Sequence, residues 1–177
     1  MKRHLIFKSA RTREPILTPQ ILENAALDVH RTSPDGKMAM ADELYLAQPN
    51  LLLSVLTLNR SIGASMEQTE TLIELLLVIW LAMKASNHQW PLITEEMQQN
   101  SLARLAGKIR LSEQLPASQK ERHIKQHLDT HPEPYLLALV HTELENQGWL
   151  QIHDKTVKEL VLVSLNLVES VATASHC

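Results

Sequence analysis

Residues 49–63 read PNLLLSVLTLNRSIG, and residues 134–148 read PYLLALVHTELENQG. The two stretches align without a gap at an offset of 85 (134 − 49 = 85), and the alignment runs on to Ser86 and Val171 with 11 identical pairs among 38. Most of the identical residues are proline, glycine, leucine and valine, which end helices or fill cores. A match at one fixed offset is the signature of a repeated structural unit. We therefore predict that the chain contains an internal duplication.

A shorter match precedes each of these stretches. Residues 15–18 read PILT and residues 91–94 read PLIT, at an offset of 76. Both end in a threonine that is suited to cap the start of a helix. We therefore divide the chain into four parts, and we expect them to form a single globular domain in which the repeats share one core. The parts are a basic N-terminal arm (1–13), a first helical repeat (14–86), a junction (87–91) and a second helical repeat (92–175).

The composition and the local signals favour helices over strands. Only 3% of the residues are aromatic, whereas strands are enriched in aromatic and β-branched side chains. The pattern S/T-x-x-E predicts a capping box at Thr71–Glu74 and another at Thr156–Glu159. Gly63 and Gly148 stand where a left-handed residue should follow a helix.

The segments that follow the two predicted capping boxes are apolar almost all round, at residues 72–83 and 157–168. A helix without a polar face is buried on most sides, so we expect these two helices to lie at the centre and to pack on each other. The apolar surplus of residues 72–83 also suggests a homodimer. The predicted fold is an all-α helical bundle, built from two tandem units of three to four helices around two apolar central helices.

The net charge, the cysteine content and the apolar runs limit which classes of function and location are expected. The net charge is −3, whereas a protein that grips nucleic acid usually carries a basic excess. The single cysteine, Cys177, allows no internal disulfide, which is typical of the cytoplasm. The longest apolar run, 75–83, is shorter than the ~18 residues of a membrane span, and the N-terminal run Leu5-Ile6-Phe7 is shorter than the ~7–15 apolar residues of a signal peptide. We expect a soluble cytoplasmic protein that does not bind membranes.

The most specific chemical pattern is a set of histidines at i, i+4 and i+8. On one helix face, neighbouring members would lie about 5–6 Å apart at Cβ, which suits two imidazoles on one divalent metal. Further ligand candidates are His141, Asp129 and Glu133. A proline at position 132 predicts that the last histidine has left the helix. The set that we test as a metal site is His123, His127 and His131.

Basic residues gather in the second repeat, where they span the extra residues that we expect between Ala103 and Ser118. They predict a phosphate-binding face as one alternative, and a solvated helix surface with interleaved acids as the other. No helix-turn-helix or zinc-finger pattern supports nucleic-acid binding. The residues are Arg104, Lys108, Arg110, Lys120, Arg122 and Lys125.

No pattern marks a catalytic site. The chain has no G-x-S-x-G elbow and no glycine-rich phosphate loop, and the capping boxes account for Glu74 and Glu159. We therefore expect a non-enzymatic binding or adaptor protein that needs no cofactor and acts on a protein partner, because repeated helical units present similar grooves. The alternatives are a metal-binding enzyme or sensor that uses His123 and His127, and a nucleic-acid binder that uses the segment 104–125.

Overall fold

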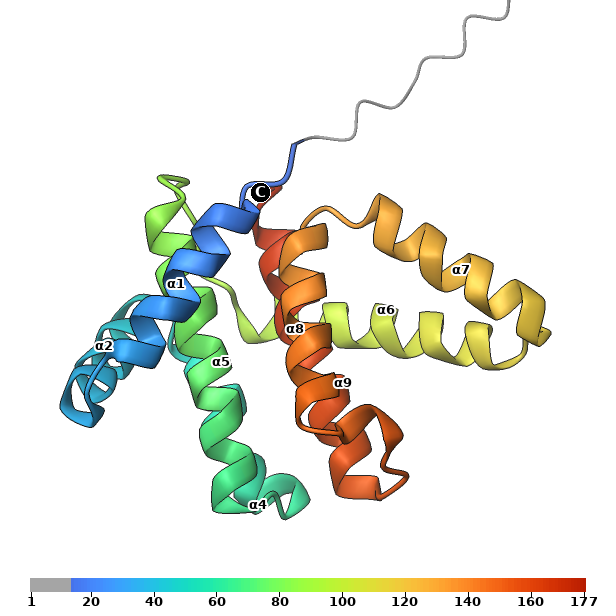
Figure 1. Ribbon diagram of the computed structural model, residues 1–177, viewed down its shortest axis with the longest axis horizontal. Coiled ribbons are helices and arrows are strands. Elements are labelled where there is room, and N and C mark those ends of the chain that lie inside the picture. Colours follow the sequence, from blue (N-terminus) through green and yellow to red (C-terminus); the bar gives the residue numbers. More distant parts are fainter. Residues whose placement is uncertain (1–13) are drawn as a thin grey trace, which may run out of the picture.

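The computed structural model describes residues 14–177, except for the side chains of residues 112–113, 117–118, 120–121 and 123–124. The predicted basic arm, 1–13, lies outside the described residues. Within the described part, every regular element is a helix and no strand occurs, which confirms the all-α class (Figure 1). None of these helices has both the length and the apolarity to cross a bilayer.

The chain forms nine α-helices and one 3-10 turn within the described residues. In chain order they are α1 (Pro19–Arg31), α2 (Pro34–Ala47), α3 (Pro49–Leu56), α4 (Leu58–Ile62), α5 (Met66–Ala85), α6 (Glu95–Glu113), α7 (Ala117–Thr130), α8 (Pro134–Asn146), η1 (Trp149–Gln151) and α9 (Lys155–Ala174).

Some helix ends follow the sequence signals closely. Thr18 caps α1 and accepts a hydrogen bond from the Ile21 amide at 3.4 Å. Gly63 ends α4 at φ 72° and Gly148 follows α8 at φ 70°, so both glycines adopt the predicted left-handed conformation. An L-residue pays a steric cost there that glycine avoids.

The predicted capping boxes of the two long apolar helices are wrong. Helix α5 is capped further upstream, because Ser65 and Gln68 form the box instead, and the Thr71 hydroxyl donates to the Glu67 carbonyl inside the helix. Helix α9 is capped by Asp154, whose carboxylate accepts from the amides of residues 156 and 157. In both cases a better acceptor upstream captures the unpaired N–H groups first.

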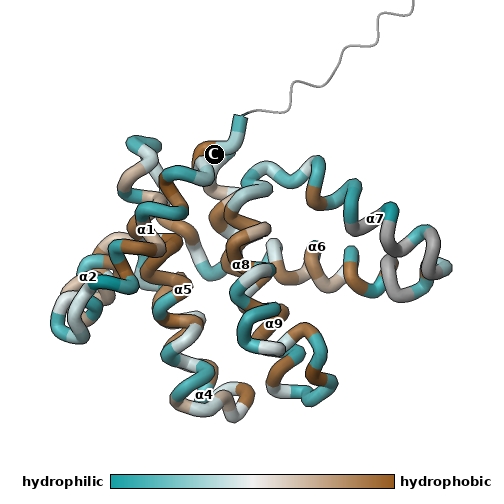
Figure 2. Tube along the Cα trace, viewed as in Figure 1, coloured by the Kyte–Doolittle hydropathy of each residue, from teal (hydrophilic) through white to brown (hydrophobic). Residues whose placement is uncertain are grey.

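The core is formed largely by α5 and α9, and Figure 2 marks the hydrophobic residues along the helices. Ten residues of α5 and nine of α9 are buried. The prediction that these helices pack mainly on each other is wrong, because α5 packs chiefly against α1 and α3, and α9 against α6 and α8. The apolar side chains of α5 are covered within one chain, so they give no reason to expect a homodimer.

A buried carboxylate at the start of α8 fixes the segment that leads into α1. The Glu133 side chain is fully buried and accepts the backbone N–H of Ile16 at 3.1 Å and of Leu17 at 3.0 Å. Two N–H donors face two carboxylate oxygens, so both donors are satisfied. This contact joins parts of the chain that are far apart in sequence, because Ile16 precedes the first helix and Glu133 precedes the eighth.

A buried amide at the start of α3 does the same for the segment that leads into α6. The Gln48 side chain accepts the Ile93 N–H and donates to the Pro91 carbonyl, both at 2.8 Å. Here one donor and one acceptor face the side chain, which an amide satisfies and a carboxylate does not. Gln48 and Glu133 are related by the offset of the longer sequence match (133 − 48 = 85), and Leu17 and Ile93 by that of the shorter one (93 − 17 = 76).

Candidate functional site

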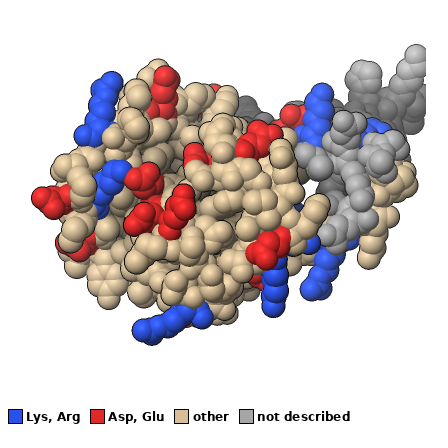
Figure 3. Space-filling view, turned by 60° about the horizontal axis from the view of Figure 1, so that its bottom comes forward, with Lys and Arg blue, Asp and Glu red and all other residues tan. Residues whose placement is uncertain are grey.

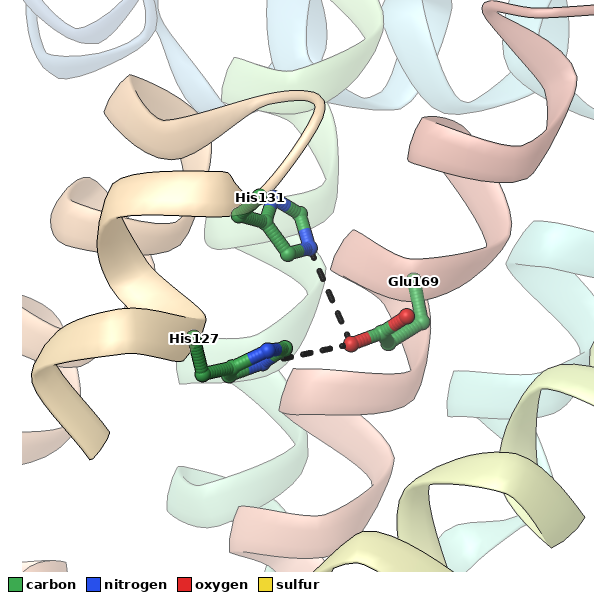
Figure 4. Close-up of side chains that lie close together, drawn as sticks. All are labelled: His127, His131 and Glu169. Carbon is green, nitrogen blue, oxygen red and sulfur yellow. Dashed lines mark ion pairs between the residues drawn. The ribbon is translucent and has the colours of Figure 1, made fainter. Parts of the chain in front are cut away.

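Two histidines and one glutamate meet where α7 ends beside α9 (Figure 4). Helix α7 supplies His127, its C-terminal cap is His131, and α9 supplies Glu169. The Nε2 atom of His127 lies 3.6 Å from Glu169 Oε1, and the Nε2 atom of His131 lies 3.7 Å from the same oxygen. One ligand atom from each residue falls within 4.8 Å of the other two. We call these three residues the His–Glu cluster.

The local backbone explains how both imidazoles reach one carboxylate. Residues four apart on a helix share a face, so His127 and His131 start on the same side of α7. At His131 the backbone turns to φ −66°, ψ 137°, and the helix ends there as Pro132 predicted. This turn carries the His131 ring inward, where its side chain is only 1% exposed.

The three side chains of the cluster differ in how far they are exposed to solvent. The side chain of Glu169 is 12% exposed and that of His127 is 30% exposed, so the solvent side is the His127 side. The buried Nε2 of His131 has no hydrogen-bond partner, because 3.7 Å is too long for one. A buried nitrogen without a partner is costly, and a bound ion is one of the recognised ways to satisfy such a group.

The other ring nitrogen of His131 bears on what Nε2 can do. Nδ1 accepts the Glu133 N–H at 3.1 Å, so a neutral ring carries its proton on Nε2. A metal on Nε2 would instead place the remaining proton on Nδ1 and would break this hydrogen bond. Leaving a buried N–H unpaired costs about 1–3 kcal/mol, which three metal–ligand bonds can offset. The hydrogen bond therefore lowers metal affinity but does not prevent metal binding.

Glu169 is held in its charged form. Burial alone would raise the pKa of its carboxyl group, but the contact with His131 and the charge of Lys108 outweigh burial and lower the pKa to about 2. The Lys108 ammonium lies 3.4 Å from Oε1, the same oxygen that both histidines approach. A carboxylate that is ionised at neutral pH can serve as an ion-pair partner or as a metal ligand.

The structure brings together two of the three histidines that the sequence singled out. The side chain of His123 lies outside the described residues. Asp129 and His141 are exposed and take no part in the cluster, and the Glu133 carboxylate holds Ile16 and Leu17 instead.

Sequence reasoning missed Glu169, which is separated from His131 by the whole of α8 and most of α9. One signal was present, because Glu169 is the only Asp, Glu, Lys or Arg between Leu160 and the C-terminus. A lone acid in an apolar helix needs a partner.

The basic segment is partly engaged within the protein. The Arg104 guanidinium donates to the Ser101 hydroxyl at 3.0 Å and to the Thr173 hydroxyl at 2.9 Å, and Lys108 pairs with Glu169. The side chain of Lys120 lies outside the described residues. On the face shown in Figure 3, basic and acidic side chains are interspersed over much of the surface. The remaining members are on α6 and α7: Arg110, Arg122 and Lys125.

A groove of about 400 Å³ lies between α3, α6 and α9, and we call it the α3–α6–α9 groove. Its apolar lining includes Leu53, which is 43% exposed, together with Leu102 and Val163. Glu95 is the only titratable side chain among the described lining residues. The other lining residues are Asn50, Ser54, Thr57, Gln98, Gln99, Asn166 and Leu167.

A second, smaller groove of about 230 Å³ lies between α1, α5 and α8. It is more polar, because His30, Glu74 and Glu143 line it beside Val78. Glu74 does not cap a helix, as the sequence suggested, but pairs with Lys37 of α2.

Comparison of the chain with protein-family models, curated proteins and solved structures finds no match. The geometry of the His–Glu cluster and of the grooves is therefore what bears on function.

Proposed function

We propose that the protein is a non-enzymatic cytoplasmic binding or adaptor protein, which takes up a segment of a protein partner in the α3–α6–α9 groove. The observation that carries this proposal is an apolar groove of about 400 Å³ that leaves Leu53 43% exposed. A leucine side chain gains about 1.5–3 kcal/mol when it is fully buried, so an exposed leucine in a concave site favours a partner.

The groove has the chemistry of a peptide site. Leu53, Leu102 and Val163 offer apolar contact, and amide side chains line the same site, where Gln99 donates to Glu95 and Asn50 donates to the Ile93 carbonyl. An amphipathic helix recognises such a groove with apolar anchors one turn apart. With Glu95 as the only titratable lining residue among those described, the groove offers no acid–base pair for catalysis.

The relation between the two grooves supports the proposed duplication. If α1, α3 and α5 correspond to α6, α8 and α9, then the groove between α3, α6 and α9 corresponds to the groove between α8, α1 and α5. Val163 of one groove and Val78 of the other are related by the offset of the longer sequence match (163 − 78 = 85). The reciprocal contacts of Gln48 and Glu133 point the same way. The wider groove is the better candidate for a partner.

Two matched leucine variants test the proposal. Leu53 and Leu27 are both helical and both 43% exposed, but Leu27 lines neither groove. We expect affinity capture from native lysate with the full chain to retain a stoichiometric protein partner. Leu53→Glu should lose this partner, because a carboxylate would enter the apolar groove, and Leu27→Glu should keep it. A partner that Leu53→Glu retains, or no stoichiometric partner at all, would overturn the proposal.

A further inference from the structure

We propose that His127, His131 and Glu169 form a binding site for one divalent transition-metal ion, with Zn²⁺ as the expected ion. Two imidazoles and one carboxylate are a common donor set for zinc. The same donors disfavour Mg²⁺ and Ca²⁺, which prefer oxygen ligands only. This site is independent of the partner groove.

The distances within the cluster suit a shared ion better than direct hydrogen bonds. Zinc lies about 2.0–2.2 Å from nitrogen and oxygen ligands, so two ligands at a tetrahedral angle are about 3.4 Å apart. The separations from Glu169 Oε1 are 3.6 Å to His127 and 3.7 Å to His131, too long for good hydrogen bonds and within a few tenths of an ångström of this value. The three ligand atoms lie within 4.8 Å of one another, so the side chains would move slightly closer together to share one ion.

Burial and charge also favour a cation at this point. The buried Nε2 of His131 has no hydrogen-bond partner, and a metal would supply one. The carboxylate of Glu169 contributes a negative charge in a half-buried setting, where screening by water is weak. Three protein ligands leave one coordination position for solvent on the His127 side.

Such an ion would fasten α7 to the body of the protein. The described contacts of α7 are mainly with α6 and α8, and Figure 1 shows α7 projecting beside α6. Ligands from the end of α7 and from α9 would add a link between these two helices. An ion that binds only the folded protein stabilises it, by an amount that grows with the logarithm of the ratio of free metal to Kd, so the role that follows is structural.

Zinc titration of the full chain tests the site directly. The protein should carry Cys177→Ser throughout, because the terminal thiol beside His176 is a competing ligand. After removal of metal by a chelator, we expect stoichiometric Zn²⁺ binding by calorimetry and a higher melting temperature. His127→Gln and Glu169→Gln should each weaken binding by more than about 100-fold, beyond the effect of losing an outer-shell partner. His141→Gln, at an exposed histidine on α8, should bind like the parent.

A lysine variant separates a designed ion site from adventitious binding. Lys108 lies 3.4 Å from the proposed ligand oxygen and repels a cation there. Lys108→Gln should therefore tighten Zn²⁺ binding, whereas binding elsewhere on the surface would not respond. His127 and Lys108 are partly exposed, so both variants should fold, which circular dichroism would check.

Two results would overturn the metal proposal. One is the absence of stoichiometric Zn²⁺ binding by the parent protein. The other is equal Zn²⁺ affinity in the parent, His127→Gln and Glu169→Gln. Leu53→Glu should leave Zn²⁺ binding unchanged, so the metal site and the partner groove can fail separately.

Discussion

Replacing Glu133 by glutamine tests whether its two buried backbone hydrogen bonds require a carboxylate. Glutamine keeps one oxygen, so one of the two N–H groups, from Ile16 or Leu17, would still find an acceptor. The other would face an amide NH₂ group, donor against donor, in a site where residue 133 is 0% exposed. Loss of one hydrogen bond to a charged group costs about 1.5–3 kcal/mol.

We therefore expect Glu133→Gln to lower the free energy of unfolding by about 2–3 kcal/mol. For a chain of this size, that corresponds to a fall in melting temperature of about 4–12 °C. Urea unfolding followed by circular dichroism measures the change, and Glu145→Gln, at an exposed position on the same helix, is the matched control. The control should stay within about 0.5 kcal/mol of the parent.

The reciprocal change sharpens the test. Gln48→Glu would place a carboxylate oxygen against the Pro91 carbonyl, which now accepts from the Gln48 amide at 2.8 Å. Two acceptors would then meet at a residue that is 3% exposed, so this variant should lose at least as much stability as Glu133→Gln. The reasoning is refuted if Glu133→Gln stays within about 0.5 kcal/mol of the parent while the control behaves as expected.

Three further predictions concern charge and backbone conformation. The lowered pKa of Glu169 contributes stability that is present above its unfolded value of 4.5 and is lost as the pH falls towards about 2. After allowance for solvent screening this should amount to about 1–3 kcal/mol, and Glu169→Gln should flatten that part of an acid titration of unfolding. Gly63→Ala and Gly148→Ala should each lose about 1–2 kcal/mol in urea unfolding, because both glycines are left-handed although nothing lies within 4 Å of an added Cβ. Gly107 lies within α6 and also has open space around an added Cβ, so Gly107→Ala should raise the free energy of unfolding by about 0.5–1 kcal/mol. A lower free energy of unfolding would show that packing, not helix propensity, decides that position.

Local rules predicted the parts of the fold that depend on a few neighbouring residues. The cap at Thr18 and the left-handed backbone at Gly63 and Gly148 are set by sterics and by hydrogen bonds within one turn. The same rules failed at Thr71 and Thr156, because a pattern match does not say which of several acceptors captures the helix end. Ser65 and Asp154 lie upstream and take that role.

The sequence predicted only the part of the candidate site that depends on residues close together in the chain. His127 and His131 share a helix face, so their proximity follows from a spacing of four residues. Glu169 joins them because α9 passes beside the end of α7, and that depends on how whole helices pack. The position of the groove at Leu53 and Val163 has the same origin, since it lies between helices that are far apart in sequence.

A comparison of Glu169 with Lys84, the residue that the sequence match pairs with it, bears on the His–Glu cluster. Lys84 of α5 and Glu169 of α9 are related by the offset of the longer sequence match (169 − 84 = 85), and each forms an ion pair with a residue of another helix. In the first half Lys84 forms an exposed ion pair with Glu43 at 2.7 Å. At Glu169 the charge is reversed: the carboxylate pairs with Lys108 of α6 at 3.4 Å and also faces two imidazoles at 3.6 and 3.7 Å.

An ion pair that holds two helices together needs one cation at close range, as Lys84 and Glu43 show. The cluster in the second half has looser distances and a second imidazole whose buried nitrogen has no hydrogen-bond partner. An ion pair between two helices does not require that second ring. Burying a polar nitrogen that has no hydrogen-bond partner destabilises the fold. A metal ion would give Nε2 of His131 a partner at the cost of the hydrogen bond between Nδ1 and the Glu133 N–H, and it would hold Glu169 Oε1 about as far from each imidazole as is observed. Lys108 already supplies the one cation for Glu169, so the two additional imidazoles are what a metal site would explain, and they are the reason to look for zinc at His127, His131 and Glu169.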